Sequence, residues 1–212
     1  MAGASDTVGV ILAGGLSRRM GGGDKGLRTL AGKPMLAHVI ERLAPQVQCC
    51  VINANGDASR FIPFALPVVP DTFGDFAGPL AGVLAGMRWA LSHVPETRCI
   101  VTVPSDSPLL PGDLVARLAA GLAPQRETIV LAQSMGRLHP VVGLWPVFLA
   151  SELQDALEAG VRKILAWTDR HGAVQVSFPP MHLAGIEFDP FFNANTPEEF
   201  ETLRGLLEAG TR

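Results

Sequence analysis

A glycine-rich segment near the amino terminus carries the residues best suited to chemistry. Residues 12–25 read LAGGLSRRMGGGDK and combine five glycines with three cations, Arg18, Arg19 and Lys25. Glycine has no Cβ, so backbone N–H groups in such a segment can surround anionic oxygens at close range. The apolar run 8–11 precedes the segment and predicts a buried strand. A strand, a basic glycine loop and a helix in this order are typical of sites that hold the phosphates of a nucleotide.

Two common nucleotide motifs fit this loop poorly. A P-loop ends in Gly-Lys followed by Ser or Thr, whereas Gly26 is followed by Leu27. The dinucleotide motif G-x-G-x-x-G can be placed on Gly21, Gly23 and Gly26, but it then begins well after the strand and lies in a loop with too much positive charge. A long surface loop without a ligand is the other alternative. Glycine-rich loops at the end of a first buried strand rarely lack a function, so we favour phosphate binding.

Asp106 is the carboxylate best placed to hold a metal ion. It lies in the segment PSDSP (104–108), just beyond the apolar, β-branched run 99–103, which predicts a strand covered on both faces. Ligands of open α/β sheets bind beyond the carboxyl ends of the strands, and Mg²⁺ takes one or two carboxylates together with phosphate oxygens. The alternative is an Asx turn before Pro108, as aspartate often forms. We favour the metal.

Asn53 and Asp71 are predicted to lie at that same edge of the sheet. Each stands at the end of a strand-like run, 49–53 and 66–70 respectively. The amide of Asn53 can donate to and accept from a ribose or a base edge, and the carboxylate of Asp71 can accept from base N–H groups or ribose hydroxyls. The alternative is that both residues cap turns, and for the neighbouring Asn55-Gly56-Asp57 the turn is the better interpretation.

Composition and charge restrict the classes to which the protein can belong. The chain has 212 residues, 48% hydrophobic and 17% charged, which suits one compact α/β domain. A net charge of −3 argues against a nucleic-acid partner, and no apolar run approaches the roughly 20 residues that span a bilayer, which argues against a membrane partner. The amino terminus shows no export signal, and Cys49, Cys50 and Cys99 lack C-x-x-C spacing. We therefore expect a cytoplasmic protein with reduced thiols and no zinc site.

Apolar runs alternate with helical patterns along the chain, which predicts an α/β fold in a single three-layer domain: a mostly parallel sheet with helices on both faces. Strands are expected at 7–13, 49–53, 66–70, 99–103, 128–132, 138–145 and near 173–178. Helices are expected at 34–43 and 111–122, each with a proline at its first position, at 79–92, at 147–170 with an interruption near Gly160, and after Pro197. No linker divides residues 1–212, so we expect one domain with a nucleotide half (1–110) and a second-substrate half (111–212).

The order and spacing of these segments resemble a known enzyme family. The likeness is carried by LAGG (12–15), DKG (24–26), LAGKP (30–34), VINAN (51–55), Pro70-Asp71, GPLAG (78–82), PSDSP (104–108), His139-Pro140 and NANTP (193–197). Together they resemble the molybdenum cofactor guanylyltransferases, within the nucleotidyltransferase superfamily, over nearly the whole chain. The resemblance implies the Rossmann-like fold of nucleotide-diphospho-sugar transferases. It also implies transfer of GMP from GTP to the phosphate of Mo-molybdopterin, with release of pyrophosphate.

The resemblance further implies roles for individual residues. Catalysis would rest on Lys25, Arg19 and Asp106, with Mg²⁺ as the cofactor on Asp106. A fixed cation such as Lys25 stabilises the charge that grows on the departing oxygens, and does so more in the transition state than in the ground state. The nucleotide-binding set is Leu12, Ala13, Gly14, Gly15, Lys25, Asn53, Asp71 and Asp106. The pterin-binding set is His139, Arg162, Lys163, Asn193 and Asn195.

Structural roles stay open for the pterin-binding set. His139 is equally well explained as a core histidine, and Arg162-Lys163 either bind the phosphate of the pterin or form a solvated helix face. Asn193 and Asn195 precede Thr196, which has the features of the N-cap of the closing helix. An N-cap and a ligand role can coexist there.

Other functions are compatible with parts of the sequence. Relatives that use CTP on the same pterin tend toward LAAG where this chain has LAGG, which favours GTP. Sugar-phosphate nucleotidyltransferases are usually longer than this chain. A non-catalytic nucleotide or cofactor carrier would need the glycine loop but neither Asp106 nor the pterin side. For the enzyme we expect GTP and Mo-molybdopterin as partners, with transient contacts to the cofactor donor and to acceptor apo-enzymes.

Overall fold

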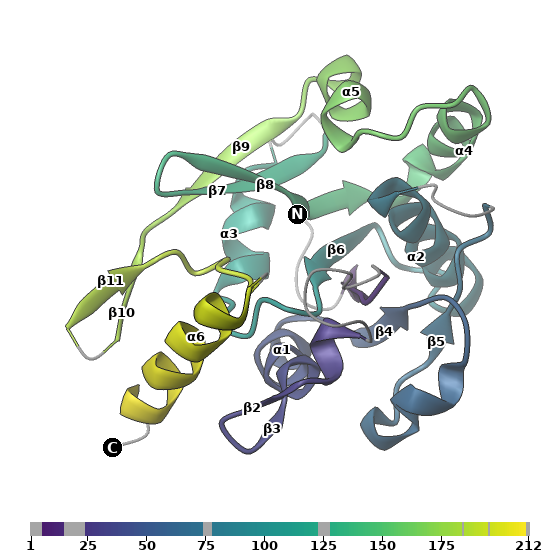
Figure 1. Cartoon of the computed structure of the whole chain (residues 1–212). Helices are drawn as coiled ribbons and strands as arrows, with labels where there is room; N and C mark the ends of the chain where they lie inside the picture. The colour runs from purple at the N-terminus through teal and green to yellow at the C-terminus, as the bar shows by residue number, and fades with distance from the viewer. Residues whose placement is uncertain are drawn as a thin grey trace.

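A seven-stranded sheet forms the centre of the protein. The computed structural model describes residues 6–14, 24–73, 78–122, 128–183, 185–194 and 196–210 (Figure 1). The strand order is β5-β4-β1-β6-β8-β7-β9. The strands are β1 (Thr7–Leu12), β4 (Cys49–Asn53), β5 (Val68–Val69), β6 (Cys99–Pro104), β7 (Val130–Ser134), β8 (Arg137–Pro146) and β9 (Val174–Phe178). All neighbouring pairs are parallel except the two that include β8, so the prediction of a mostly parallel sheet is confirmed.

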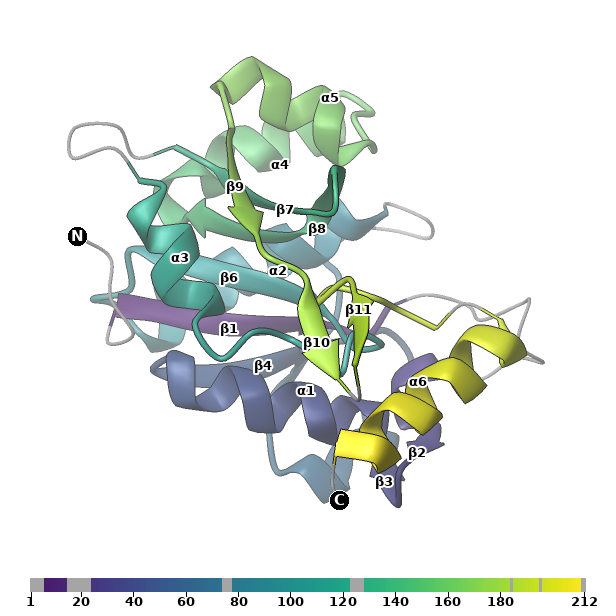
Figure 2. The same cartoon turned by 90° about the vertical axis from the view of Figure 1, so that its left-hand side faces the viewer.

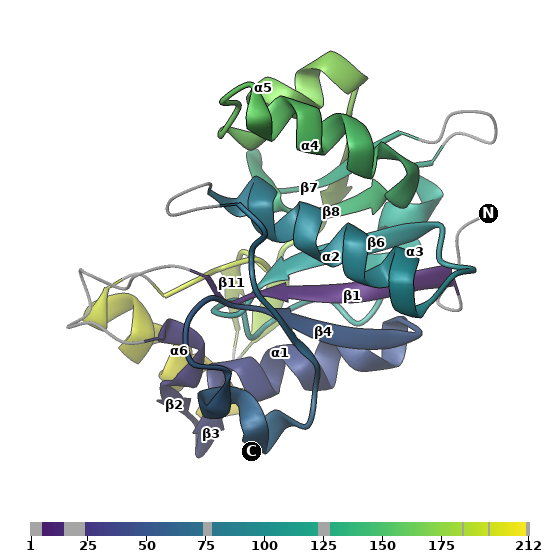
Figure 3. The same ribbon diagram turned by 90° about the vertical axis from the view of Figure 1, so that its right-hand side faces the viewer.

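Helices cover both faces of this sheet, as predicted. On one face lie α1 (Met35–Leu43) and α3 (Leu114–Ala120), and on the other lie α2 (Pro79–His93) and α4 (Ala150–Glu158), followed by α5 (Ile164–Thr168) (Figures 2 and 3). Each face has its own cluster of buried apolar side chains, one packed against α1 and α3 and the other against α2, α4 and α5. Alternate side chains of β1 and β6 enter the two clusters, which is why both strands are buried on both faces and mostly apolar.

A third, smaller core lies beyond the sheet. It is built by two hairpins, β2 (Thr29–Leu30) with β3 (Lys33–Pro34) and β10 (Met181–Leu183) with β11 (Ile186–Phe188), and by α6 (Pro197–Gly210). Neither hairpin is predicted by the sequence pattern, because their strands are too short to show alternation. The cap of α6 is predicted correctly: Thr196 Oγ1 accepts from Glu199 N–H, and Glu199 Oε2 accepts from Thr196 N–H.

Short 3₁₀ turns complete the fold: η3 (Lys25–Leu27), η4 (Ala44–Gln46), η5 (Ala58–Phe64), η6 (Val147–Leu149) and η7 (Asp169–His171).

The starts of two helices differ from the predictions. Pro34 occupies the N-cap of α1 rather than its first position. The helix expected from residue 111 begins at Leu114, because the side chain of Gln46 donates to Pro111 O (2.9 Å) and accepts from Val115 N–H (3.0 Å), which holds 111–113 in a turn.

The interruption predicted near Gly160 is confirmed. The helix α4 ends at Glu158, Gly160 has a φ of +85°, and α5 begins only at Ile164.

All three cysteines are free thiols, and Cys50 and Cys99 are buried. Burial raises the pKa of Cys50 to about 12, so this thiol stays protonated at neutral pH. Within the described residues, no helix combines the length and the apolarity needed to cross a membrane.

Candidate active site

The carboxyl ends of three parallel strands meet at one edge of the sheet. In β1, Leu12 pairs with Asn53 of β4 on one side and with Pro104 of β6 on the other. The ladder continues just past β1, because Ala13 N–H donates to Asn53 O (2.8 Å) and Ser105 N–H donates to Leu12 O (3.1 Å). The chain leaves the sheet here at three adjacent points, which is the position where open α/β sheets bind ligands.

The predicted loop residues fall partly at this edge. Leu12 and Ala13 are buried, whereas Gly14 is exposed and no described atom lies within 4 Å of the place where its Cβ would be. The backbone at Gly14 is therefore accessible to a ligand. Two other predicted residues, Gly15 and Arg19, lie outside the described residues.

Lys25 and Asp106 lie together at this edge of the sheet, which is necessary if both side chains act on one ligand. Lys25 Nζ is 3.6 Å from Asp106 Oδ2, and the residue Asp106 is only 8% exposed. A Cβ on Gly26 would come within 2.9 Å of Ser105 Cβ, so only glycine lets η3 lie this close to the turn after β6. Burial raises the pKa of Asp106 above its ordinary value, and the Lys25 ammonium opposes that shift only in part.

Asn53 and Asp71 also lie together, and a third residue that the sequence did not assign to the site, Asn55, binds Asp71 as well. Asn53 Nδ2 donates to Asp71 Oδ1 (2.9 Å), and Asn55 Nδ2 donates to Asp71 Oδ2 (2.8 Å). Asn55 Oδ1 accepts from Asp71 N–H (2.8 Å), so Asn55 is more than a turn residue. The spacing Asn53-x-Asn55 after a strand was the available signal, because alternate residues of an extended chain share a face.

The first turn of α2 packs directly on this polar cluster. A Cβ on Gly82 would lie 2.3 Å from Asn53 Oδ1 and 2.7 Å from Leu12 Cδ2. Gly82 therefore allows the helix to approach the end of β4. Gly78, with a φ of +73°, precedes this helix, and its Cβ position is 3.3 Å from Arg162 O, so the segment 161–163 lies beside the start of α2.

In the second half of the chain, His139 faces a carboxylate that sequence reasoning missed. His139 Nε2 lies 3.0 Å from Asp189 Oδ2, and the imidazole packs on the ring of Phe191 at 4.9 Å between centroids. Burial raises the pKa of Asp189, but contacts with His139 and with Phe191 N–H outweigh burial and hold it below its ordinary value. Ser107 Oγ donates to Phe191 O (3.4 Å), which joins this group to the turn that carries Asp106.

The other described residues of the predicted pterin-binding set lie in two separate segments of the chain. Arg162 Nη1 donates to Leu157 O (2.7 Å) and Val161 O (3.0 Å), so its guanidinium closes the carboxyl end of α4. Lys163 is exposed just before α5, and Asn193 is half-buried in the segment after Phe191. Asn195 lies outside the described residues. Phosphate binding by Arg162 and Lys163 stays a prediction.

Asp106 suits a cation that takes most of its ligands from a substrate. Within the described residues, no group of three or more His, Cys, Asp or Glu side chains gathers into a metal-binding cluster. Asp106 instead offers one buried carboxylate at the open edge of the sheet. A hard divalent cation that binds through one carboxylate and phosphate oxygens fits this arrangement.

Known proteins resemble the chain over most of its length. The sequence model of the MobA-like NTP transferase domain matches residues 9–174. A molybdenum cofactor guanylyltransferase from Bradyrhizobium sp. (strain ORS 278) is 50% identical over 192 residues, which cover 90% of this chain and 88% of that protein. The chain belongs to the molybdenum cofactor guanylyltransferase family. Another family member, from Mesorhizobium japonicum, is 43% identical over 97% of this chain and 98% of its own.

Solved structures agree with the family. Molybdopterin-guanine dinucleotide biosynthesis protein A from Archaeoglobus fulgidus has a TM-score of 0.68 and 25% identity, and the alignment covers 95% of this chain and 98% of that one. The 4-diphosphocytidyl-2C-methyl-D-erythritolsynthase from Anaerococcus prevotii has a TM-score of 0.70 at 10% identity, with 97% of each chain covered, and shows the fold alone. The protein is thus an enzyme of the nucleotidyltransferase class with the Rossmann-like fold of the guanylyltransferase family.

Proposed function

We propose that the protein transfers GMP from GTP to the phosphate of Mo-molybdopterin, giving the guanine dinucleotide form of the cofactor and pyrophosphate. The observation that carries this proposal is the pairing of Lys25 with the buried Asp106 at the joined ends of β1 and β6. Relatives named for this activity match the chain along nearly its whole length. We propose one domain in which residues 1–110 hold the nucleotide and residues 111–212 receive the pterin.

The reaction needs charge neutralisation more than proton transfer. An oxygen of the pterin phosphate attacks the α-phosphorus, a new P–O bond forms, and the bond to the β-phosphate oxygen breaks as pyrophosphate leaves. The attacking oxygen is already anionic, so no general base is required. Lys25 neutralises charge on the departing oxygens, and backbone groups of 12–14 orient the triphosphate. A divalent cation, which we propose is Mg²⁺, would be held by Asp106 and supplies further positive charge when bound.

The polar cluster on β4 and β5 is suited to the nucleoside. Asn53 and Asn55 hold the carboxylate of Asp71 from two sides, so its orientation is set before a ligand binds. Ordered acceptors of this kind recognise ribose hydroxyls or base N–H groups. Among the described residues, those that we assign to the pterin are His139, Arg162, Lys163 and Asn193.

Selective release of pyrophosphate tests the proposal. The full-length protein is incubated with Mo-molybdopterin, Mg²⁺ and one of the four nucleoside triphosphates. Pyrophosphate should appear with GTP, and omission of Mg²⁺ or of the pterin should abolish it. Release with CTP alone would instead assign a cytidylyltransferase. Tight binding of GTP without release would assign a non-catalytic carrier.

The contact between Gly82 and Asn53 predicts a second result. Gly82→Ala places a methyl carbon at a position only 2.3 Å from Asn53 Oδ1, so one of the two groups must move. We expect a raised KM for GTP, because Asn53 must move away from Asp71, and a loss of about 1–3 kcal/mol in the free energy of unfolding. Gly205→Ala is the matched control: no described atom lies within 4 Å of its Cβ position in α6, so alanine should leave the KM unchanged and stabilise the helix. An unchanged KM in Gly82→Ala would contradict the role of Asn53.

A further inference from the structure

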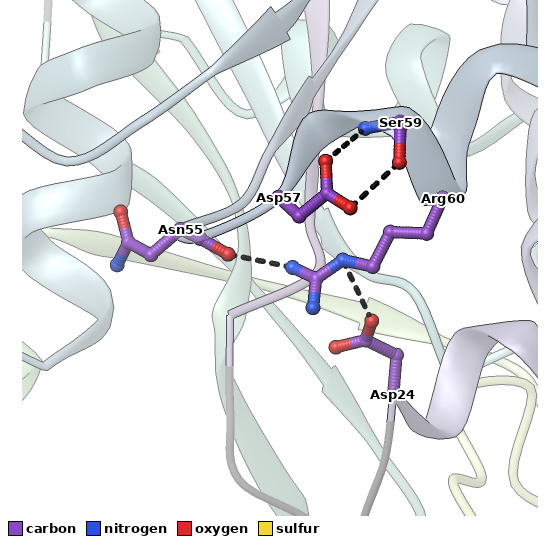
Figure 4. Close-up of polar contacts among 5 residues, drawn as sticks. All are labelled: Asp24, Asn55, Asp57, Ser59 and Arg60. Atoms are coloured by element: carbon purple, nitrogen blue, oxygen red, sulfur yellow. Dashed lines mark hydrogen bonds and ion pairs between the residues drawn. The ribbon is translucent and has the colours of Figure 1, made fainter.

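Asp24 and Arg60 form an ion pair beside the site that the roles above do not use. Asp24 directly precedes Lys25, and its side chain is only 15% exposed. It occupies the N-cap of η3, yet its carboxylate makes no hydrogen bond to that turn. Arg60 Nε lies 3.1 Å from Asp24 Oδ2 instead (Figure 4). The carboxylate next to Lys25 is therefore held by η5, a different segment of the chain.

Arg60 contacts two segments at once. Its Nη2 donates to Asn55 O at 2.6 Å, while its guanidinium carbon lies 5.0 Å from the ring centre of the buried Phe61. Asp57 fixes the start of η5, because its carboxylate accepts from Ser59 N–H (2.9 Å) and from Ser59 Oγ (2.6 Å) (Figure 4). The backbone that carries Arg60 is thus anchored independently of Asp24. A guanidinium suits this place, since its planar fork reaches two acceptors in fixed directions.

Asn55 extends this contact to the nucleoside side. Its side chain holds Asp71 through two hydrogen bonds of 2.8 Å, and Asp71 in turn accepts from Asn53. A continuous chain of polar contacts therefore runs from Asp24, next to Lys25, to the end of β4. The two parts of the nucleotide site are coupled through one side chain, Arg60.

The charge of Arg60 matters as much as its geometry. Two largely buried carboxylates belong to the surroundings of Lys25: Asp24 is its neighbour in the sequence, and Asp106 Oδ2 lies 3.6 Å from its Nζ. An unpaired carboxylate there would repel the phosphates, because charges in partly buried positions are poorly screened. Arg60 offsets the carboxylate of Asp24 and leaves that of Asp106 to act on the ligand.

We propose that Arg60 is a positioning residue for the nucleotidyl transfer. It holds Asp24 and Asn55 together, sets the place of Lys25 relative to the Asn53–Asp71 pair, and neutralises a carboxylate beside the triphosphate. The inference rests on the proposed function, since its readout is the kinetics with GTP.

Arg60→Ala tests the inference in the full-length enzyme. We expect kcat/KM for GTP to fall about tenfold or more, through both a lower kcat and a higher KM, while the KM for Mo-molybdopterin stays the same. Arg60→Lys should recover part of the loss, because it keeps the charge beside Asp24 but not the fork. Arg117→Ala is the matched control: Arg117 also pairs through Nε with an aspartate, Asp113, and lies over a phenylalanine ring, but on α3. The Arg117→Ala variant should leave kcat/KM for GTP unchanged.

A second-site variant separates positioning from general stability. Adding Asp24→Asn to Arg60→Ala removes the uncompensated carboxylate, so the double variant should be more active than Arg60→Ala alone. A further loss in the double variant, or kcat/KM for GTP unchanged in Arg60→Ala, would overturn the inference. A parent enzyme that releases no pyrophosphate from GTP would instead overturn the proposed function, and binding of a fluorescent GTP analogue would still compare the variants.

Discussion

Asp106→Asn is expected to lower kcat by about 10²–10³-fold or more while the protein stays folded. Asparagine keeps the size and shape of the side chain but removes its negative charge. The buried carboxylate would then no longer be available to hold a cation against the phosphates, and the amide of asparagine binds divalent cations far more weakly. Steady-state pyrophosphate release with GTP, Mg²⁺ and Mo-molybdopterin measures the loss.

Asp106→Asn is expected to raise the stability of the protein relative to the parent, by an amount that depends on pH. Burial raises the pKa of Asp106, so its ionisation costs more in the folded chain than in the unfolded chain. Its contribution to the free energy of unfolding is present at low pH and is lost as the pH rises through the raised pKa. Asparagine does not ionise. The Tm of Asp106→Asn relative to the parent should therefore increase from about pH 4 to pH 7.

Asp113→Asn is the control for the effect of Asp106→Asn on kcat. Asp113 follows in the same connection between β6 and α3, but its side chain is 54% exposed and pairs with Arg117. Its replacement should leave kcat unchanged. Full activity of Asp106→Asn, or a Tm difference that shrinks as the pH rises, would contradict the role given to the buried carboxylate.

Lys25→Ala is expected to lower kcat by about 10²–10³-fold. The ammonium group lies 3.6 Å from Asp106, at the edge of the sheet where our proposal places the leaving phosphates. Its charge stabilises the departing pyrophosphate more than bound GTP, so kcat should fall more than the affinity for GTP. Single-turnover pyrophosphate release and equilibrium binding of GTP, measured side by side, separate these two effects.

Two further variants test that the lysine acts by its charge. Lys25→Arg keeps the charge and should recover part of the rate. Lys33→Ala removes a more exposed lysine that also pairs with a carboxylate, that of Glu41, and should leave kcat unchanged. A loss of GTP affinity with kcat unchanged in Lys25→Ala would show that Lys25 only binds substrate.

Much of the fold could be predicted because its determinants are local. The runs that form β1, β4 and β6 are apolar and β-branched, and they alternate with helical segments, which identifies a mostly parallel sheet. Boundaries were less accurate where a distant side chain decides them. The start of α3 is displaced from Pro111 because Gln46, on another segment, caps the helix. The strands of β10 and β11 span three residues each and carry too little pattern to be found.

The residues of the candidate site likewise fall into those that the sequence predicts and those that it does not. Lys25 and Asp106 were visible because glycine, proline and charged residues follow predicted strands, but their approach to 3.6 Å depends on packing between Gly26 and Ser105. Asp189 and Arg60 could not be found from the sequence. Their partners lie in other segments, and an isolated charged residue in a loop has no pattern that distinguishes it from a solvated one.

A crystal structure of the protein with GTP and Mg²⁺ would test the proposed site most directly. We expect triphosphate density at the joined ends of β1 and β6, with Lys25 against the phosphate oxygens, Asp106 on the metal, and the nucleoside toward Asn53 and Asp71. A nucleotide bound elsewhere, with Lys25 and Asp106 still paired only to each other, would contradict it.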